Sequence, residues 1–291
     1  MAHDTSFDSP VLSIEHDGDI ATLWLDRPEA RNAMGVDLWR DLPRAMAVIS
    51  NDAAVRVVVI AAKGPHFTVG LDLKAMGGLL SGGGGADAGS TPNEPAAPPS
   101  MAARARSARS EVLRLQAAIS SVEECPKPVI AAVHGYCIGG GVDLIAACDI
   151  RLASADAVFS VREAKVAIVA DLGSLQRLPR IINAGHLAEL AFTGKDIDAG
   201  RARDIGLVND VAAADAEGVL KAAYELAREI AANSPIAVQG TKAVLAANDG
   251  RTVAEGLDYV ATWNAGMLAS DDLVEAMMAF MEKRPPKFTG R

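Results

Sequence analysis

The sequence has few cysteines, and their arrangement does not suggest disulfide bonds. Cys125, Cys137 and Cys148 form no CxxC pair, and an odd number argues against a disulfide framework. The first ten residues lack the basic and apolar segments of a secretory signal, and residues 289–291 do not match a peroxisomal targeting motif. We therefore expect a protein of the reducing cytoplasm.

The sequence also lacks an excess of basic residues and long hydrophobic runs. It has 28 lysines and arginines against 37 aspartates and glutamates, a net charge of −9 over 291 residues. A nucleic-acid-binding domain usually has a basic face, so this balance argues against one. No apolar run reaches the ~18–20 residues of a membrane span. The length instead suits one large domain, or a domain with an appendage.

The hydrophobic pattern predicts strands that alternate with helices. The expected strands are residues 11–15, 20–25, 55–62, 129–133, 150–153 and 157–161, and the first two form a hairpin. The expected helices are residues 36–50, 101–124 and 139–148, with a short one from Leu71. Pro43 should kink the first helix or mark a boundary. After about Gly200 the pattern indicates helices only. The alternation indicates an α/β fold.

Residues 77–100 differ in composition from the rest of the chain. They are rich in glycine, alanine, serine and proline, so they bury too little apolar surface to become ordered alone. We expect a flexible insertion within the first domain. Two interpretations stay open, disorder without function and a lid that orders when ligand binds.

Two loops that join an expected strand to an expected helix have features of a site for negative charge. Residues 67–73 (FTVGLDL) lead into a helix whose first N–H groups lack intrahelical partners, and such donors stabilise developing charge. Residues 134–143 (HGYCIGGGVD) contain three consecutive glycines, which let the backbone approach a ligand closely. This second loop is neither a GxGxxG fingerprint nor a Walker loop. A tight turn packed against a neighbour explains it equally well.

Three acidic residues occur in apolar surroundings. Asp143 lies within VDLIAAC, Glu163 follows an expected strand, and Asp171 ends an apolar run. Burial is unfavourable for a carboxylate and raises its pKa, which suits an acid or a base. Structural roles are also possible. Asp143 could stabilise a helix N-terminus, Glu163 could form an ion pair with Arg162 or Lys165, and Asp171 could cap a helix that starts near Ser174.

Together these motifs resemble the crotonase (enoyl-CoA hydratase/isomerase) superfamily over residues 20–272. LDRPEARNAM at residues 25–34 resembles the early coenzyme A-binding segment, FTVGLDL the first oxyanion loop, and HGYCIGGGVDL the second. The resemblance implies a spiral of ββα units, residues 1–199, followed by a helical oligomerisation region, residues 200–291. It also implies a homotrimer or a dimer of trimers.

Within the superfamily, the sequence is most similar to the branch that converts 3,5-dienoyl-CoA to 2,4-dienoyl-CoA. That branch has three acidic residues in this region, and the matching positions are Asp143, Glu163 and Asp171. Enoyl-CoA hydratases normally have glutamate at the position of Asp143 and glycine at that of Asp171. The resemblance therefore implies an isomerase of fatty-acid-type acyl-CoA degradation. Glu163 would serve C2 of the acyl chain, Asp171 would serve C6, or the reverse, and Asp143 would tune the pair.

The resemblance also implies which residues bind the substrate. The backbone N–H groups of Leu71 and Gly140 would form the oxyanion hole. The other coenzyme A-binding residues implied are Arg31, Ala33, Val69, Asp72, Leu73, Lys74 and Gly139. Lys283, Lys287 and Phe288 resemble residues that reach the coenzyme A of a neighbouring subunit. No metal and no separate cofactor is implied, because coenzyme A is part of the substrate.

Three other functions remain as alternatives. A hydratase could use Asp143 to hold the attacking water. Asp171 is the residue that distinguishes an isomerase from such a hydratase. An RNA-binding protein of this fold is suggested by Arg104, Arg106, Arg109 and Arg114, although their spacing also fits a solvated helix face. A non-catalytic assembly subunit is the third, and the acidic trio argues against it.

Overall fold

The computed structural model describes residues 7–74 and 100–291, so the expected insertion at residues 77–100 lies outside the described residues except for Ser100. The larger sheet has the strand order β1-β2-β3-β4-β6-β9, and the smaller has the order β5-β7-β8. The strands are β1 (Leu12–Asp17), β2 (Ile20–Leu25), β3 (Val57–Ala62), β4 (Val129–Val133), β5 (Tyr136–Ile138), β6 (Ile150–Ser154), β7 (Val158–Ser160), β8 (Ile197–Asp198) and β9 (Asp210–Ala213). The α/β expectation is confirmed.

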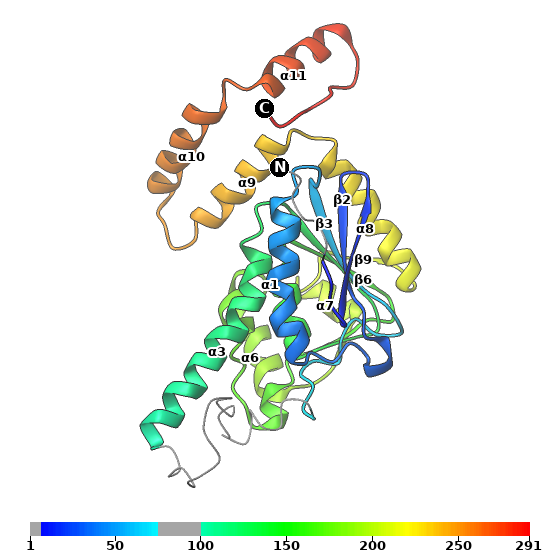
Figure 1. The fold of residues 1–291 in the computed structure, drawn as a ribbon, viewed down its shortest axis with the longest axis vertical. Coiled ribbons are helices and arrows are strands. Elements are labelled where there is room, and N and C mark those ends of the chain that lie inside the picture. Colours follow the sequence, from blue (N-terminus) through cyan, green and yellow to red (C-terminus); the bar gives the residue numbers. More distant parts are fainter. Residues whose placement is uncertain (1–6, 75–99) are drawn as a thin grey trace, which may run out of the picture.

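The larger sheet is covered on both faces, as expected for parallel strands. β1 and β2 form the predicted antiparallel hairpin, and the remaining pairs are parallel. The helices are α1 (Val36–Asn51), α3 (Met101–Glu123), α4 (Gly140–Ala146), α5 (Ser174–Arg177), α6 (Ala184–Thr193), α7 (Ala199–Asp204), α8 (Ala216–Ala231), α9 (Pro235–Ala247), α10 (Val253–Met267) and α11 (Asp271–Glu282). Figure 1 shows α1 and α3 on one side of the sheet and α8 on the other.

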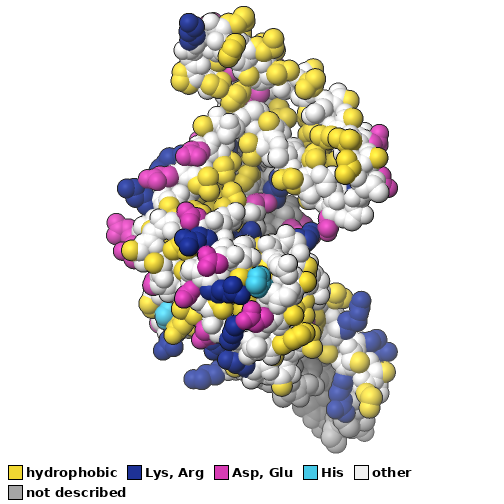
Figure 2. Space-filling view, turned by 180° about the vertical axis from the view of Figure 1, so that it is seen from behind, with side chains coloured by type: hydrophobic (Ala, Val, Ile, Leu, Met, Phe, Trp, Pro, Cys, Tyr) yellow, Lys and Arg dark blue, Asp and Glu magenta, His cyan; other side chains and the backbone are white. Residues whose placement is uncertain are grey.

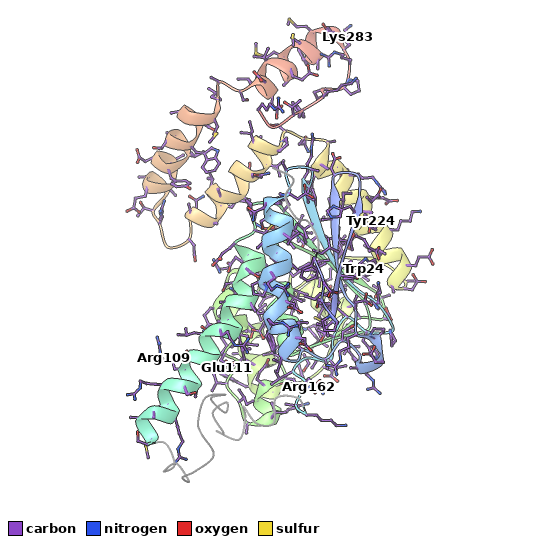
Figure 3. All side chains as sticks on the ribbon, in the orientation of Figure 1. Trp24, Arg109, Glu111, Arg162, Tyr224 and Lys283 are labelled. Atoms are coloured by element: carbon purple, nitrogen blue, oxygen red, sulfur yellow. The ribbon has the colours of Figure 1, made fainter. Side chains whose placement is uncertain are left out.

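The sequence of β3 explains why this sheet has two cores. All six residues, VVVIAA, are buried. Successive side chains of a strand point to opposite faces. Val58 and Ile60 accordingly join the core that contains α1 and α3, while Val57 and Val59 join the one that contains α8. On the α8 side, the hydroxyl of Tyr224 is 2.6 Å from Oγ1 of Thr22 on β2. Tyr224 and Trp24, labelled in Figure 3, both pack against the core on this side.

Three of the expected helices have close counterparts, with one correction. The helix predicted at residues 139–148 is α4. The helix predicted at residues 101–124 is α3, and Ser100 caps it by accepting a hydrogen bond from the N–H of Ala103 at 3.2 Å. The helix predicted at residues 36–50 is α1, and it continues through Pro43, so a boundary there is wrong. The expected helix from Leu71 can be followed only to Lys74, where the described residues are in a bridge and a turn.

The chain after Gly200 is not purely helical, which corrects the sequence analysis. β9 pairs in parallel with β6 at the edge of the larger sheet, and α8 packs on that sheet. In contrast, α9, α10 and α11 form an arm that extends beyond the sheet in Figure 1. Division of the chain into residues 1–199 and 200–291 as domains stays a prediction. Among the described residues, no helix combines the length and apolar character needed to cross a membrane.

Candidate active site

The two glycine-containing loops lie side by side. The N–H of Phe67 donates to the carbonyl of His134 at 2.9 Å, and the N–H of Thr68 donates to that of Tyr136 at 2.8 Å. These bonds align the first loop with β5, a three-residue strand that the sequence analysis missed because it is too short to show alternation. The contact depends on glycine at position 70. Its φ is +84°, and a Cβ there would lie 2.6 Å from the carbonyl oxygen of Ile138.

Two backbone donors are available where these loops meet. No hydrogen bond among residues 7–74 and 100–291 uses the N–H of Leu71 or of Gly140. Gly140 is the first residue of α4, so its N–H has no intrahelical acceptor. The amide nitrogen of Gly140 is 3.7 Å from the position a Cβ of Gly70 would take, next to Leu71. The two predicted oxyanion-hole residues are thus brought together.

The early segment predicted to bind coenzyme A runs beside the first loop. The carbonyl of Arg31 accepts from the N–H of Val69 at 3.2 Å, and the N–H of Met34 donates to the carbonyl of Gly70 at 2.8 Å. Arg31 has a φ of 52° and an exposed side chain. This brings Arg31 and its neighbour Ala33 alongside Val69 and Leu71.

The remaining predicted coenzyme A residues follow at the end of the first loop. Asp72 is held by an ion pair with Arg27, with Nη1 to Oδ2 at 2.9 Å. Leu73 and Lys74 are exposed. Their exposure, next to the Leu71 amide, is compatible with contacts to a ligand that enters from solvent.

Asp143 is the most deeply buried of the three acidic residues. It lies in the first turn of α4 with 1% of its surface exposed. Its Oδ1 accepts the N–H of Ser174 at 2.5 Å, and its Oδ2 is buried without a hydrogen-bond partner among the described residues. Asp143 therefore caps the start of α5, the role that the sequence analysis offered as an alternative for Asp171.

Glu163 points toward the oxyanion loops. It begins the short helix η2 (Glu163–Val166), and its Oε1 is 3.2 Å from the position a Cβ of Gly139 would take. Its Oε2 is buried and has no partner among the described residues. The basic neighbour Arg162 pairs with Asp196 instead. The structural alternative, an ion pair of Glu163 with Arg162 or Lys165, is therefore wrong, since no ion pair joins Glu163 to either residue in the described part of the chain.

Asp171 completes the acidic group, and the three carboxyls affect one another. Burial, followed by the charge of Glu163, raises the pKa of Asp143 to about 7. Burial is also the main reason that the pKa of Glu163 is raised, and the negative charge of Asp171 raises it further. The pKa of Asp171 is raised by burial as well. A raised pKa makes a carboxylate a better proton acceptor than an exposed one, which suits acid–base chemistry.

The C-terminal residues that resemble coenzyme A contacts are not part of this site. Lys283 follows α11, and Figure 3 shows it at the opposite end of the molecule from Arg162, the neighbour of Glu163. Lys287 donates its backbone N–H to Glu275, and the carbonyl of Phe288 accepts from Arg56. Within one chain, Lys283 therefore cannot contact a substrate held between the oxyanion loops.

Comparisons with known proteins agree with this geometry. The sequence model of the family described as enoyl-CoA hydratase/isomerase matches residues 15–93 and 96–291. The chain is 42% identical to a peroxisomal Delta(3,5)-Delta(2,4)-dienoyl-CoA isomerase of Arabidopsis thaliana, over 96% of this chain and 95% of that protein. It is 43% identical to the mitochondrial Delta(3,5)-Delta(2,4)-dienoyl-CoA isomerase of Mus musculus, over 90% of this chain and 76% of that protein.

A solved structure gives the same result for the fold. An enoyl-CoA hydratase from Bacillus anthracis superposes with a TM-score of 0.82 at 30% identity, over 97% of this chain and 100% of that one. The chain belongs to the enoyl-CoA hydratase/isomerase family. It is an enzyme with the crotonase fold, and an acyl-CoA thioester fits it as substrate.

The comparisons also correct one expectation. The two isomerases are named peroxisomal and mitochondrial, so the expectation of a cytoplasmic protein is wrong. It rested on cysteine content and the chain ends, and the cysteines do not distinguish these compartments from the cytoplasm. The expectation that the enzyme needs no metal and no separate cofactor stays a prediction.

Proposed function

We propose that this protein isomerises 3,5-dienoyl-CoA to 2,4-dienoyl-CoA. The observation that carries the proposal is Asp171. It is the third acidic residue of the group with Asp143 and Glu163, and its charge contributes to the raised pKa of both other carboxyls. A double-bond shift from 3,5 to 2,4 removes a proton at C2 and adds one at C6, so it requires acid–base groups at two separated carbons. The two isomerases to which the chain is similar support this activity.

The reaction would begin at the thioester carbonyl. We place its oxygen between the N–H groups of Leu71 and Gly140, where no protein acceptor competes among the described residues. Loss of the C2 proton moves an electron pair onto this oxygen and gives an enolate that is conjugated with both double bonds of the substrate. Two preorganised donors stabilise that charge, and loss of one typically lowers the rate by roughly 10²–10³.

We assign the C2 proton to Glu163 because of its position. Its carboxyl faces Gly139, the residue before the oxyanion donor Gly140, and C2 is bonded to the carbonyl carbon that Gly140 would hold. Protonated Asp171 then delivers a proton to C6, and the electron pair returns from the oxygen to form the 2,4-diene. Exchange with solvent restores both carboxyls. Asp143 adjusts the pair through its charge and does not transfer a proton.

Isotope exchange in D₂O tests the activity and the assignment together. Wild-type protein should produce the ultraviolet absorbance of a 2,4-dienoyl-CoA from a 3,5-dienoyl-CoA. Asp171→Asn should produce none, yet it should still incorporate deuterium at C2 of the substrate. Glu163→Gln should lose both. If Glu163→Gln instead kept deuterium exchange at C2 and Asp171→Asn lost it, Asp171 would serve C2 and Glu163 would serve C6. Hydration of a 2-enoyl-CoA without any isomerisation would replace the proposed function with that of a hydratase.

We also propose that the protein is a homotrimer or a dimer of trimers. The arm has exposed apolar side chains, shown at the upper end of Figure 2. They include Val253, Leu257, Leu268, Val274, Met277, Phe280 and Met281. A soluble monomer rarely exposes so large an apolar patch. In an assembly, Lys283 and Phe288 could approach a neighbouring copy's coenzyme A. Light scattering after size exclusion should give three or six times the chain mass, and a monomer would contradict the proposal.

A further inference from the structure

We propose that Gln116 and Arg177 are positioning residues for the isomerisation. They fix the backbone of residues 171–173, the 171–173 segment, so that the carboxyl of Asp171 is held at the reacting end of the acyl chain. This inference rests on the proposed function, in which Asp171 protonates C6. Neither residue was singled out from the sequence, because nothing in a local pattern connects α3 with a loop more than fifty residues away.

Arg177 lies directly against the 171–173 segment. It ends α5, and only 8% of its surface is exposed. Its Nη1 donates to the carbonyl of Leu172 at 3.2 Å. A Cβ on Gly173 would lie 1.8 Å from the same nitrogen, so the guanidinium occupies the space that a side chain would need. Gly173 also has a φ of +127°, a conformation suited to glycine.

One face of α3 binds both the 171–173 segment and Arg177. Ser120 and Glu123 follow Gln116 by four and seven residues, which places all three on the same side of the helix. Nε2 of Gln116 donates to the backbone carbonyl of Asp171 at 2.6 Å. Ser120 and Glu123 accept from Nη2 and Nε of Arg177 at 3.0 and 2.8 Å. Helix α3 thus anchors the segment directly through Gln116 and indirectly through Arg177.

Every carbonyl of the 171–173 segment accepts a hydrogen bond. The carbonyl of Gly173 accepts from the N–H of Arg177 at 2.8 Å, and the next residue, Ser174, donates its N–H to Asp143. The segment therefore links two of the three acidic residues. A shift of this backbone would change the position of Asp171 relative to the substrate, and a misplacement of 1 Å can cost roughly 10²-fold in rate.

Gln116→Met tests the inference with little change of side-chain length. It removes the donor to the Asp171 carbonyl and leaves the oxyanion loops and Glu163 untouched. We expect kcat for isomerisation to fall ~10- to 100-fold, with KM nearly unchanged. Deuterium exchange at C2 in D₂O should continue, because that step depends on Glu163. Arg177→Lys should behave in the same way, since lysine cannot bridge Leu172, Ser120 and Glu123 together.

Arg180→Gln is the matched control. Arg180 also binds Glu123, with Nη2 to Oε1 at 3.1 Å, but within the described part of the chain it makes no hydrogen bond or ion pair with the 171–173 segment, and it is exposed. It should keep wild-type kcat. If Gln116→Met folds and keeps kcat within about twofold of wild type, the positioning role is wrong. A parallel loss of C2 exchange and isomerisation would also overturn it, because it would indicate general damage. A wild type without isomerase activity would instead refute the proposed function itself.

Discussion

At the scale of single residues, the burial of Asp143 has a consequence for stability. Its pKa is raised from 3.8 to about 7 in the folded state, by burial first and by Glu163 second. The folded chain therefore binds this proton more tightly than the unfolded chain does. Between these two pKa values the folded state holds more protons, so its stability falls as pH rises. Above about pH 7 the full penalty of an ionised, buried carboxylate is present.

Asp143→Asn should accordingly stabilise the protein at high pH. Asparagine keeps an oxygen acceptor for the N–H of Ser174 and carries no charge. We expect the free energy of unfolding at pH 8 to rise by at most ~4 kcal/mol, with the gain vanishing near pH 4. Denaturant unfolding at several pH values measures this. Glu225→Gln, an exposed carboxylate on α8, should show no such trend. A gain that is constant with pH would contradict the explanation.

Gly70 gives a second prediction at this scale. Gly70→Ala combines a φ of +84° with a Cβ 2.6 Å from the carbonyl oxygen of Ile138, so the two oxyanion loops must separate. Misplacement of the Leu71 amide should lower kcat by roughly 10²–10³. Gly18→Ala is the control, because Gly18 has a φ of +59° and no neighbouring atom within 4 Å of the new Cβ. It should lose ~1–2 kcal/mol of stability and keep its activity.

At the scale of elements, α4 depends on support at its C-terminal end. Arg151 is buried, and its Nη1 donates to the carbonyl of Ile145 within α4 at 3.5 Å and to that of Cys148, just beyond the helix, at 2.7 Å. The helix has only seven residues, and its first residue supplies the Gly140 amide. A short helix is marginal without such end contacts. Arg151 therefore supports, from its opposite end, the helix whose first amide is the predicted oxyanion donor.

Arg151→Met should destabilise the protein and weaken catalysis together. It leaves buried carbonyls without a charged donor, which costs about 3 kcal/mol. Fraying of α4 would also disorder the Gly140 amide, so we expect a lower melting temperature and a reduced kcat. Arg203→Met removes an exposed arginine on α7 and should change neither. Thermal unfolding and the dienoyl-CoA assay provide both measurements. A large loss of stability with an unchanged kcat would contradict the idea that Arg151 holds the Gly140 amide in place through α4.

The elements also show what a single sequence can predict. β3 and β4 were identified because unbroken runs of apolar residues mark buried strands. β5 and β9 were missed because three or four residues paired by tertiary contacts carry too little periodicity. The acidic residues were found from their apolar surroundings. Their supporting residues, such as Gln116, were not, because their hydrogen bonds join distant parts of the chain.

At the scale of the whole molecule, the chain end connects the arm to the core. The buried carboxylate of Asp272 at the start of α11 accepts from the N–H of Thr289 at 2.7 Å and from the hydroxyl of Ser234 at 2.7 Å. Nη2 of Arg56, next to β3, donates to the carbonyl of Phe288 at 2.6 Å. The last residues thus return to the sheet and hold α11 close to α9.

This arrangement predicts that acid loosens α11 from the start of α9 and from the last residues. Burial alone would raise the pKa of Asp272, but the hydrogen bonds from Ser234, Thr289 and Gly290 outweigh it, and the pKa is lowered. The stabilisation is therefore complete above its ordinary value of 3.8 and is lost as pH falls through the lower folded value. Asp272→Asn should weaken the attachment already at pH 7, and the exposed neighbour Asp271→Asn should not. Hydrogen exchange of α11 measures the attachment, and equal protection in both variants would contradict this role.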